Sequence, residues 1–376
     1  MKAIVLSGGG SKGAYEIGVW KALRKLHIHY DIVTGTSVGA LNAVFMVQKD
    51  YKKAEKLWKQ LNYDLLFSES IDEKKLQKQG NFYLLKAYLK EILGSGGMNV
   101  SKLDETIQKN LSLQKFYQSK IDFGMITVHL DNLKPICLTK KEIKKEELHD
   151  YLMASAACFP AFQMKKIEGS HFIDGGYYDN LPINLAISMG ADEIIAVDLQ
   201  AIGRKQKVKN NQVPITYIIP RNEIGNFLVF NKEQSIKAIQ YGYHDTLKTF
   251  GKLDGNLYTF RKNHLKIHHI LYSKKWRKMI SSITSIKEYS ELEVLELLGK
   301  TFELEEYPLY SIFSFRKRIK TSYKKENKKI REWWSQKSII LNFAFLIENK
   351  DYEKVKKRMK EFPLEFLAAS YLVSLH

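Results

Sequence analysis

The sequence predicts an α/β fold with a mainly parallel sheet, followed by a mostly helical region. Twice within the first 48 residues a short apolar run leads through a glycine turn into an apolar helix, and this order is typical of a parallel sheet. Beyond Gly251 the pattern changes to helical periodicity with dense charge and no further unit of this kind. We therefore expect a first domain over 1–253 and a basic, mostly helical accessory region over 254–376.

The individual elements follow from the spacing of apolar residues. Short β-branched and apolar runs suit strands that are buried on both faces, and apolar residues at helical spacing predict the helices between them. Residues 51–118 read as mostly helical, and the polar, basic segment 203–212 reads as a surface loop. The predicted elements are strand 2–7, helix 14–25, strand 30–34, helix 40–48, strands 121–129 and 135–139, helix 146–157, and strands 194–199 and 215–219.

Composition and charge limit the class of protein. Hydrophobic residues make up 44% and charged residues 27% of the chain, as in folded proteins. The net charge is +19, of which +16 falls after residue 200. Such a basic balance favours anionic partners, which include membrane surfaces, nucleic acids and acidic substrates. We find no recognisable nucleic-acid-binding module, so nucleic acid is not an expected partner.

Features of targeting and metal binding are missing from the sequence pattern. There is no apolar stretch of about 18 residues that predicts a transmembrane helix, and the apolar run at the N-terminus is too short for a signal peptide. The two cysteines, Cys137 and Cys158, imply no disulfide framework. No histidine or cysteine cluster has the spacing of metal ligands. We expect a cytoplasmic protein, at most peripheral to a membrane, without metal or cofactor.

A serine lies in the second glycine turn, which reads Gly35-Thr36-Ser37-Val38-Gly39. A serine between a strand and a helix projects its hydroxyl outward at a sharp turn, and flanking glycines let the two elements approach closely. The first N–H groups of the following helix face any developing negative charge. The pattern fits a nucleophile, and it fits equally well a serine that caps a helix.

Three consecutive glycines form the first turn, which runs from Gly8 through Gly9 and Gly10 to Gly13. Backbone N–H groups in such a turn can face a phosphate or the oxyanion of acyl transfer. A phosphate loop needs Lys and then Ser or Thr after its last glycine, whereas Ala14 stands there. A dinucleotide site needs an acidic residue at the end of the next strand, and Asp31 precedes that strand instead. The oxyanion interpretation accounts for both glycine turns.

An aspartate ends a short predicted strand and is followed by two glycines, in the order Asp174-Gly175-Gly176. Glycines behind an acid allow it to approach another stretch of backbone closely, so Asp174 is a candidate general base for Ser37. The same three residues also suit an ordinary Asp-Gly turn.

Taken in order, these motifs resemble the patatin-like phospholipase family. The resemblance covers about the first 200 residues, and a segment at 237–246 is similar to the helix that ends the core of bacterial members. The part after about residue 253 is not covered. The matching blocks are Gly8–Gly13, Gly35–Ala43, Ala154–Ala157 with Pro160, Asp174–Pro182, and Gly190–Asp192 leading into 194–198.

The resemblance implies a three-layer α/β/α core and a Ser-Asp dyad that needs no histidine. It implies hydrolysis of phospholipid, lysophospholipid or other glycerolipid esters through an acyl-enzyme intermediate. One departure from the family is Cys158-Phe159 before Pro160, next to the acyl pocket. By position, the implied roles are Ser37 as nucleophile, Asp174 as base, Gly8, Gly9 and Gly10 as oxyanion donors, Lys12 as the basic residue beside them, and Gly13, Gly35, Gly39, Gly175 and Gly176 as supporting glycines.

Other functions remain open at this point. A Ser-His-Asp triad would draw on one of His149, His171, His244, His264, His268 or His269, but the glycine loop at the N-terminal end of the core favours the dyad. An acyltransferase shares the acyl-enzyme step and is not separated from a hydrolase by sequence. A non-catalytic lipid-binding protein is disfavoured because the motif residues are intact.

The basic second region has two main interpretations, a solvated or lid-like face and a membrane-surface contact. The second rests on 316–337, which is basic and carries Tyr323, Trp333 and Trp334, and on the apolar run 339–347. Lys and Arg mixed with aromatic residues are typical of interfacial segments.

Overall fold

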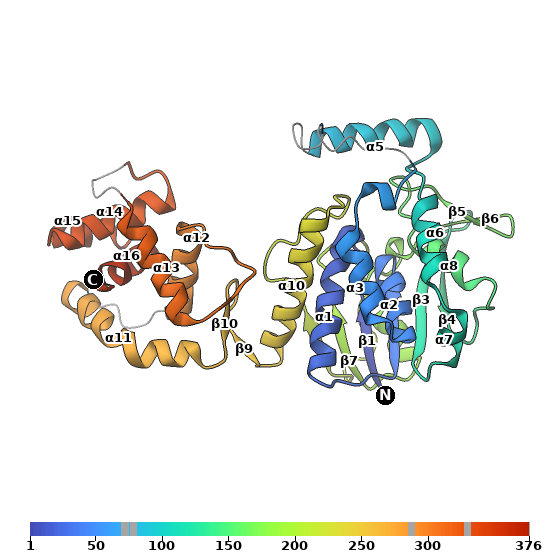
Figure 1. Cartoon of the computed structure of the whole chain (residues 1–376), viewed down its shortest axis with the longest axis horizontal. Helices are drawn as coiled ribbons and strands as arrows, with labels where there is room; N and C mark the ends of the chain where they lie inside the picture. Colours follow the sequence, from blue (N-terminus) through green and yellow to red (C-terminus); the bar gives the residue numbers. More distant parts are fainter. Residues whose placement is uncertain (69–74, 76–80, 285–289, 327–331, 376) are drawn as a thin grey trace. The chain divides into compact units, whose positions relative to one another are not determined.

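The computed structural model describes residues 1–68, 75, 81–284, 290–326 and 332–375. The chain separates into two compact units, Met1–Thr246 and Leu247–His376 (Figure 1). The division falls inside α10 (Lys232–Thr249), a few residues before the boundary expected at 253.

The first unit is built on an eight-stranded sheet with the order β5-β6-β3-β2-β1-β7-β8, and β4 pairs with β3. Neighbouring strands run parallel from β3 through β2, β1 and β7 to β8, whereas β4 and β6 pair antiparallel with β3. The predicted mainly parallel α/β fold is thus confirmed. The strands are β1 (Lys2–Leu6), β2 (Ile32–Thr36), β3 (Asp122–His129), β4 (Lys134–Thr139), β5 (Lys165–Ile167), β6 (Ser170–Asp174), β7 (Glu193–Val197) and β8 (Ile215–Ile218).

Helices cover both faces of this sheet. On one face, α2 (Val38–Gln48) packs over β1, β2 and β3 and contacts both α1 (Ala14–Lys25) and α8 (Leu148–Ser155). On the other face, α9 (Ile183–Ser188) buries alternate residues of β1 and β7, because strand side chains point to opposite faces in turn. Other elements of the unit are α3 (Tyr51–Gln60), α5 (Asn81–Ser95), α6 (Ser101–Asn110), α7 (Leu113–Gln118) and the 3-10 turns η1 (Gly10–Gly13), η2 (Tyr63–Leu65) and η3 (Gly175–Tyr177).

The second unit is a helical cluster around α16 (Pro363–Ser374). This helix packs against α11, α12 and α14, and the Trp276 indole N–H on α11 donates a hydrogen bond of 2.9 Å to the Ser370 hydroxyl. A small sheet of order β11-β10-β9 joins it, which the sequence did not predict because its strands are only two or three residues long. The elements are β9 (Leu253–Asp254), β10 (Thr259–Arg261), α11 (His264–Ile283), α12 (Glu291–Thr301), β11 (Leu309–Tyr310), α13 (Ile312–Lys324), α14 (Gln336–Glu348) and α15 (Tyr352–Arg358).

The residues expected to meet a membrane lie mainly inside this second unit. Residues 339–347 belong to α14, and their apolar side chains form part of the hydrophobic core of the second unit. Tyr323 is buried and its hydroxyl donates to Glu348, and Trp333 packs against the same core. Of the three aromatic residues, Trp334 alone is strongly exposed, at 83%. The apolar run is therefore unavailable for lipid contact, and this basis for a membrane surface is wrong. Among the described residues, no helix is long and apolar enough to cross a bilayer.

Candidate active site

Ser37 occupies a sharp turn between a strand and a helix. The strand β2 ends at Thr36 and α2 begins at Val38, so Ser37 is the one residue between them. Its backbone has φ 55° and ψ −130°, a conformation that costs a non-glycine residue about 1–3 kcal/mol. Gly35 makes the turn possible, because a Cβ atom there would lie 2.4 Å from the carbonyl carbon and oxygen of Gly39. The turn presents the Ser37 hydroxyl to the cavities described below.

A second serine holds this strained turn in place. The Ser37 amide donates a hydrogen bond of 3.0 Å to the Ser155 hydroxyl on α8. That hydroxyl in turn donates a hydrogen bond of 2.7 Å to the carbonyl of Ile126 on β3. Ser155 is fully buried, so this bridge ties the turn, α8 and the central sheet together. In the sequence, Ser155 stands within the block Ala154–Ala157, and no local pattern marks this role.

The strand β3 brings Asp174 to Ser37. The end of β2 pairs Thr36 with Ile126, and β6 pairs Asp174 with the next residue, Thr127. Because β4 occupies the opposite edge of β3 over this stretch, β2 and β6 must share one edge and meet end to end. Gly175 allows the join, since a Cβ atom there would lie 2.2 Å from the Ile126 carbonyl oxygen.

Burial gives the Asp174 carboxylate an unusual affinity for protons. The side chain belongs to a residue that is only 5% exposed, and the Gly176 amide donates a hydrogen bond of 2.7 Å to Oδ1. Removal from water raises the pKa of Asp174 to about 6, while hydrogen bonding from the Ser37 side chain and the Gly176 amide opposes that rise. A carboxylate with such a pKa is mostly ionised at neutral pH and is still able to take up a proton.

The glycine loop offers two free amides rather than the three that were expected. The Gly8 N–H donates a hydrogen bond of 3.0 Å to the Asn180 carbonyl, so it is already used. The Gly8 amide is therefore not free in this structure to act as the expected oxyanion donor. Within the described residues, the amides of Gly9 and Gly10 donate to no backbone acceptor. The Asn180 side-chain amide also donates a hydrogen bond of 3.2 Å to the Gly8 carbonyl, which fixes the start of the loop.

Lys12 and Gly13 lie next to this loop in η1, with different surroundings. Lys12 is partly buried and is not among the residues that line either cavity. Gly13 has a packing role, because a Cβ atom there would lie 2.6 Å from Val38 and 2.9 Å from the Trp58 ring.

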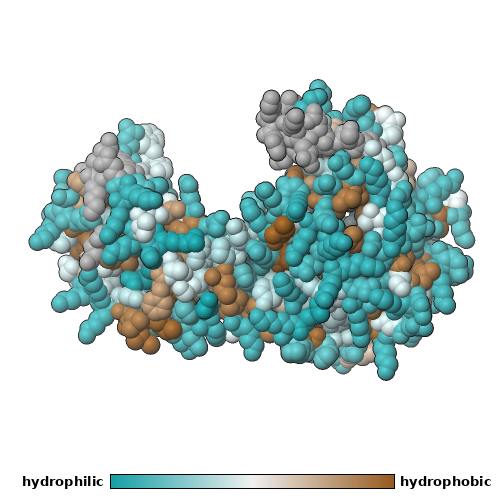
Figure 2. Space-filling model, in the orientation of Figure 1, coloured by the Kyte–Doolittle hydropathy of each residue, from teal (hydrophilic) through white to brown (hydrophobic). Residues whose placement is uncertain are grey.

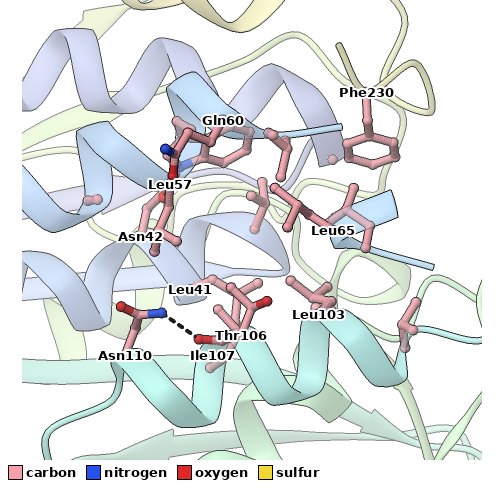
Figure 3. Close-up of a pocket in the computed structure, with 18 of the residues that line it drawn as sticks. Leu41, Asn42, Leu57, Gln60, Leu65, Leu103, Thr106, Ile107, Asn110 and Phe230 are labelled. Carbon is pink, nitrogen blue, oxygen red and sulfur yellow. Dashed lines mark hydrogen bonds between the residues drawn. The ribbon is translucent and has the colours of Figure 1, made fainter. Parts of the chain in front are cut away.

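Two cavities meet at Ser37. The first, here called the apolar cavity, has a volume of about 300 Å³ and lies between α2, α3 and α6. In Figure 3 the side chains of Leu41, Leu65 and Leu103 point into it from three sides. The second, here called the Asp174 cavity, has a volume of about 450 Å³ and includes Gly9, Gly10 and Arg204. Ser37 lines both cavities, one apolar and one more polar.

The segment at the rim of the Asp174 cavity was predicted only as a surface loop. The Arg204 amide donates a hydrogen bond of 2.8 Å to the Gly176 carbonyl, and the Arg204 carbonyl accepts one of 2.6 Å from the Asn180 amide. Lys205 holds the same loop through an ion pair of 2.6 Å with Asp198. Loop 201–205 is thus fastened to the residues that follow Asp174. No local motif marked it, because its position depends on contacts between distant segments.

The histidines considered for a triad lie elsewhere. Among the residues that line the two cavities there is no histidine. His268, for example, is buried in the second unit between Glu291 and the Tyr371 hydroxyl. No group of three or more histidine, cysteine, aspartate or glutamate side chains suited to a metal ion occurs within the described residues.

Comparisons with known proteins find similarity over about the first half of the chain. Residues 4–187 match the family model described as patatin-like phospholipase. Patatin-like phospholipase domain-containing protein 7 of Rattus norvegicus is 29% identical over 201 residues, which cover 52% of this chain and 13% of that protein. Lysophospholipase nte1 of Aspergillus terreus is 27% identical over 204 residues, which cover 53% of this chain and 12% of that protein.

The chain thus spans only a small part of the length of these curated relatives. Among solved structures, VipD from Legionella pneumophila aligns over 100% of this chain and 90% of its own, with a TM-score of 0.42 and 14% identity.

Proposed function

The chain carries a patatin-like phospholipase domain over residues 4–187, and on this premise we propose that it hydrolyses acyl esters of lipids with Ser37 and Asp174 as a catalytic dyad. The observation that carries the proposal is the position of Ser37. Ser37 lines both the apolar cavity and the Asp174 cavity, and its side chain hydrogen-bonds with the Asp174 carboxylate.

The proposed reaction has two halves. In the first, the Ser37 oxygen attacks the ester carbonyl carbon while its proton passes to Asp174, and the C–O bond to the alcohol breaks as that alcohol takes up the proton. In the second, water attacks the acyl-serine, gives one proton to Asp174 and releases the fatty acid as Ser37 regains its proton. The negative oxygen formed in each half accepts hydrogen bonds from the Gly9 and Gly10 amides, near the N-terminus of α2.

The pKa of Asp174 suits this role. A general base is most effective when its pKa lies near the working pH, because it must be ionised and still accept a proton. With a pKa of about 6, Asp174 meets both conditions at pH 7 to 8. We expect kcat/KM to rise with pH through about 6 and then to level off.

The two cavities suggest how a lipid ester is held. The apolar cavity, lined by Leu41, Leu103 and Ile107 among others, suits a fatty acyl chain. The Asp174 cavity includes the basic residue Arg204 in its lining and suits the alcohol part of the lipid with its phosphate group. Phospholipids, lysophospholipids and other glycerolipids are the proposed substrates.

Two variants test the dyad. We expect Ser37→Ala and Asp174→Asn each to lower kcat/KM for a p-nitrophenyl acyl ester on the order of 10⁴-fold, because the first lacks the nucleophile and the second lacks the base. Ser281→Ala, which removes an exposed hydroxyl in the second unit, serves as the matched control and keeps full activity. Retained turnover by Ser37→Ala would exclude it as the nucleophile, and a fatty acid released from phosphatidylcholine by the wild type alone identifies the product.

A further inference from the structure

The solvent side of α11 carries large apolar side chains. Ile270 is 73% exposed and its neighbour Leu271 is 57% exposed. The opposite side of the helix buries Trp276 and Ile280 in the core of the second unit, so α11 is held firmly while these two residues face water. In Figure 2, brown atoms gather over this helix. Adjacent exposed aliphatic residues on an ordered helix are a candidate contact surface when further apolar residues extend them into a patch.

A phenylalanine from α13 joins this exposed group. Phe313 is 48% exposed, and its ring lies 6.1 Å from the His264 ring and 6.4 Å from the Tyr272 ring, both on α11. Ile270, Leu271 and Phe313 are named the α11 patch here.

The helices around the patch carry positive charge only. Neither α11 nor α13 contains an aspartate or a glutamate. Arg277 pairs with Glu291, but the four exposed lysines of α11 form no ion pair with any carboxylate among the described residues. Those four lysines are Lys266, Lys274, Lys275 and Lys278.

We propose that the α11 patch and these lysines form a docking surface for an anionic lipid bilayer. The apolar side chains enter the boundary between head groups and acyl chains, while the lysine ammonium groups, on flexible stems, reach the surrounding phosphates. Both features are required: each lysine adds to the attraction of an anionic surface, and the apolar residues leave water. The idea rests on the proposed lipid hydrolase function, since it delivers the enzyme to the surface where its substrates lie. It also moves the membrane contact from 316–347 to α11.

Vesicle sedimentation with the full-length protein tests the surface without hydrolysis. Vesicles of ether-linked phosphatidylglycerol and phosphatidylcholine contain no acyl ester bond, so binding is measured independently of hydrolysis by Ser37. We expect binding to these vesicles, and much weaker binding to vesicles of ether-linked phosphatidylcholine alone. Replacing Lys274, Lys275 and Lys278 by alanine should weaken binding roughly a hundredfold, about fivefold for each lysine. Ile270→Ser with Leu271→Ser should weaken it about tenfold or more.

Matched controls make the same changes elsewhere in the second unit. Replacement of the exposed Lys356, Lys357 and Lys360 by alanine removes the same charge, and Trp334→Ser removes an equally exposed apolar side chain. We expect both to bind within about twofold of the wild type. Circular dichroism checks the fold of every variant, and Leu271→Gln alone replaces the double variant if that one is unstable.

Several results would overturn the proposal. Wild-type binding by the α11 variants would do so, as would equal losses in the controls. A loss with the lysine variant but none with the apolar variants would reduce the surface to a general attraction for polyanions. Light scattering that shows a dimer broken by Leu271→Gln would make the patch a contact between two copies of the chain. Turnover of a soluble ester is measured in parallel, so an inactive wild type would count against the proposed function and not against docking.

Discussion

Replacing Asp174 by asparagine should make the first unit more stable at neutral pH while it abolishes activity. The carboxylate is buried, and burial raises its pKa from 3.8 to about 6. At pH 7 the folded state must therefore keep an ionised group in a place that disfavours the charge. Asparagine has a similar shape, can still accept the hydrogen bond from the Gly176 amide, and carries no charge.

The magnitude follows from the size of the pKa shift. A rise of roughly two pK units corresponds to about 3 kcal/mol, at 1.36 kcal/mol per unit, as an upper limit on the gain. Below pH 3.8 the carboxyl is protonated in both the folded and the unfolded state, and the wild type has its full stability. Between pH 3.8 and about 6 only the unfolded state loses the proton, so the wild type becomes less stable as pH rises. Asp174→Asn has no carboxyl group to ionise at this position, so its stability does not fall in this way over this pH range.

Differential scanning calorimetry at pH 4 and pH 7 measures the effect. For a unit of this size, 1 kcal/mol shifts Tm by about 2–4 °C, so we expect a rise of several degrees at pH 7 that shrinks toward pH 4. Asp192→Asn is the matched control, because Asp192 is exposed and pairs with the N-terminal ammonium, which holds the pKa of its carboxyl below the ordinary value. That control should show no gain. A variant no more stable than the wild type at pH 7, or a gain equal at both pH values, would refute the reasoning.

Two further predictions concern the apolar cavity and a second buried acid. Leu103→Trp fills part of the cavity, so the variant should discriminate against long acyl chains. The ratio of kcat/KM for a twelve-carbon p-nitrophenyl ester to that for a four-carbon ester should fall about fourfold for each methylene excluded, at ~0.8 kcal/mol per methylene. An unchanged ratio would place the acyl chain elsewhere. Glu16 is buried on α1 and accepts a hydrogen bond from the Asn42 amide, and burial raises its pKa well above the ordinary value. The stability that protonated Glu16 contributes is present below pH 4.5 and is lost as pH rises above that value toward its folded-state pKa. Glu16→Gln should therefore flatten the fall of the urea-unfolding free energy as pH rises above 4.5, and identical slopes in the variant and the wild type would contradict this.

The sequence predicted what depends on local pattern. The strand and helix around Ser37 follow from apolar periodicity and glycine, and the structure shifts their bounds by two residues: β2 is Ile32–Thr36 rather than 30–34, and α2 begins at Val38 rather than 40. Asp174 was singled out as the end of a short strand, and it is the last residue of β6. Each of these features depends only on residues close to it in the sequence.

The sequence could not predict what depends on distant partners. The Gly8 amide is used by the carbonyl of Asn180, far along the chain, so no local signal marked it as occupied. The burial of 339–347 depends on packing between α14 and α16, and an apolar run reads the same whether it faces a core or a bilayer. No pattern in the sequence singled out α11, where Ile270 and Leu271 lie on the exposed side of an otherwise well packed helix.

The edge of β3 that joins Thr36 to Asp174 sets an order of events during synthesis. Ser37 leaves the ribosome well over a hundred residues before Asp174, and the two residues come together only when β6 has paired with Thr127 of β3. A slip of one residue in that pairing would turn the Asp174 side chain to the opposite face of the sheet. On the proposed function, a chain in which this pairing has not formed or has slipped holds Ser37 without its general base, so hydrolysis would begin only once β6 is paired in register with β3.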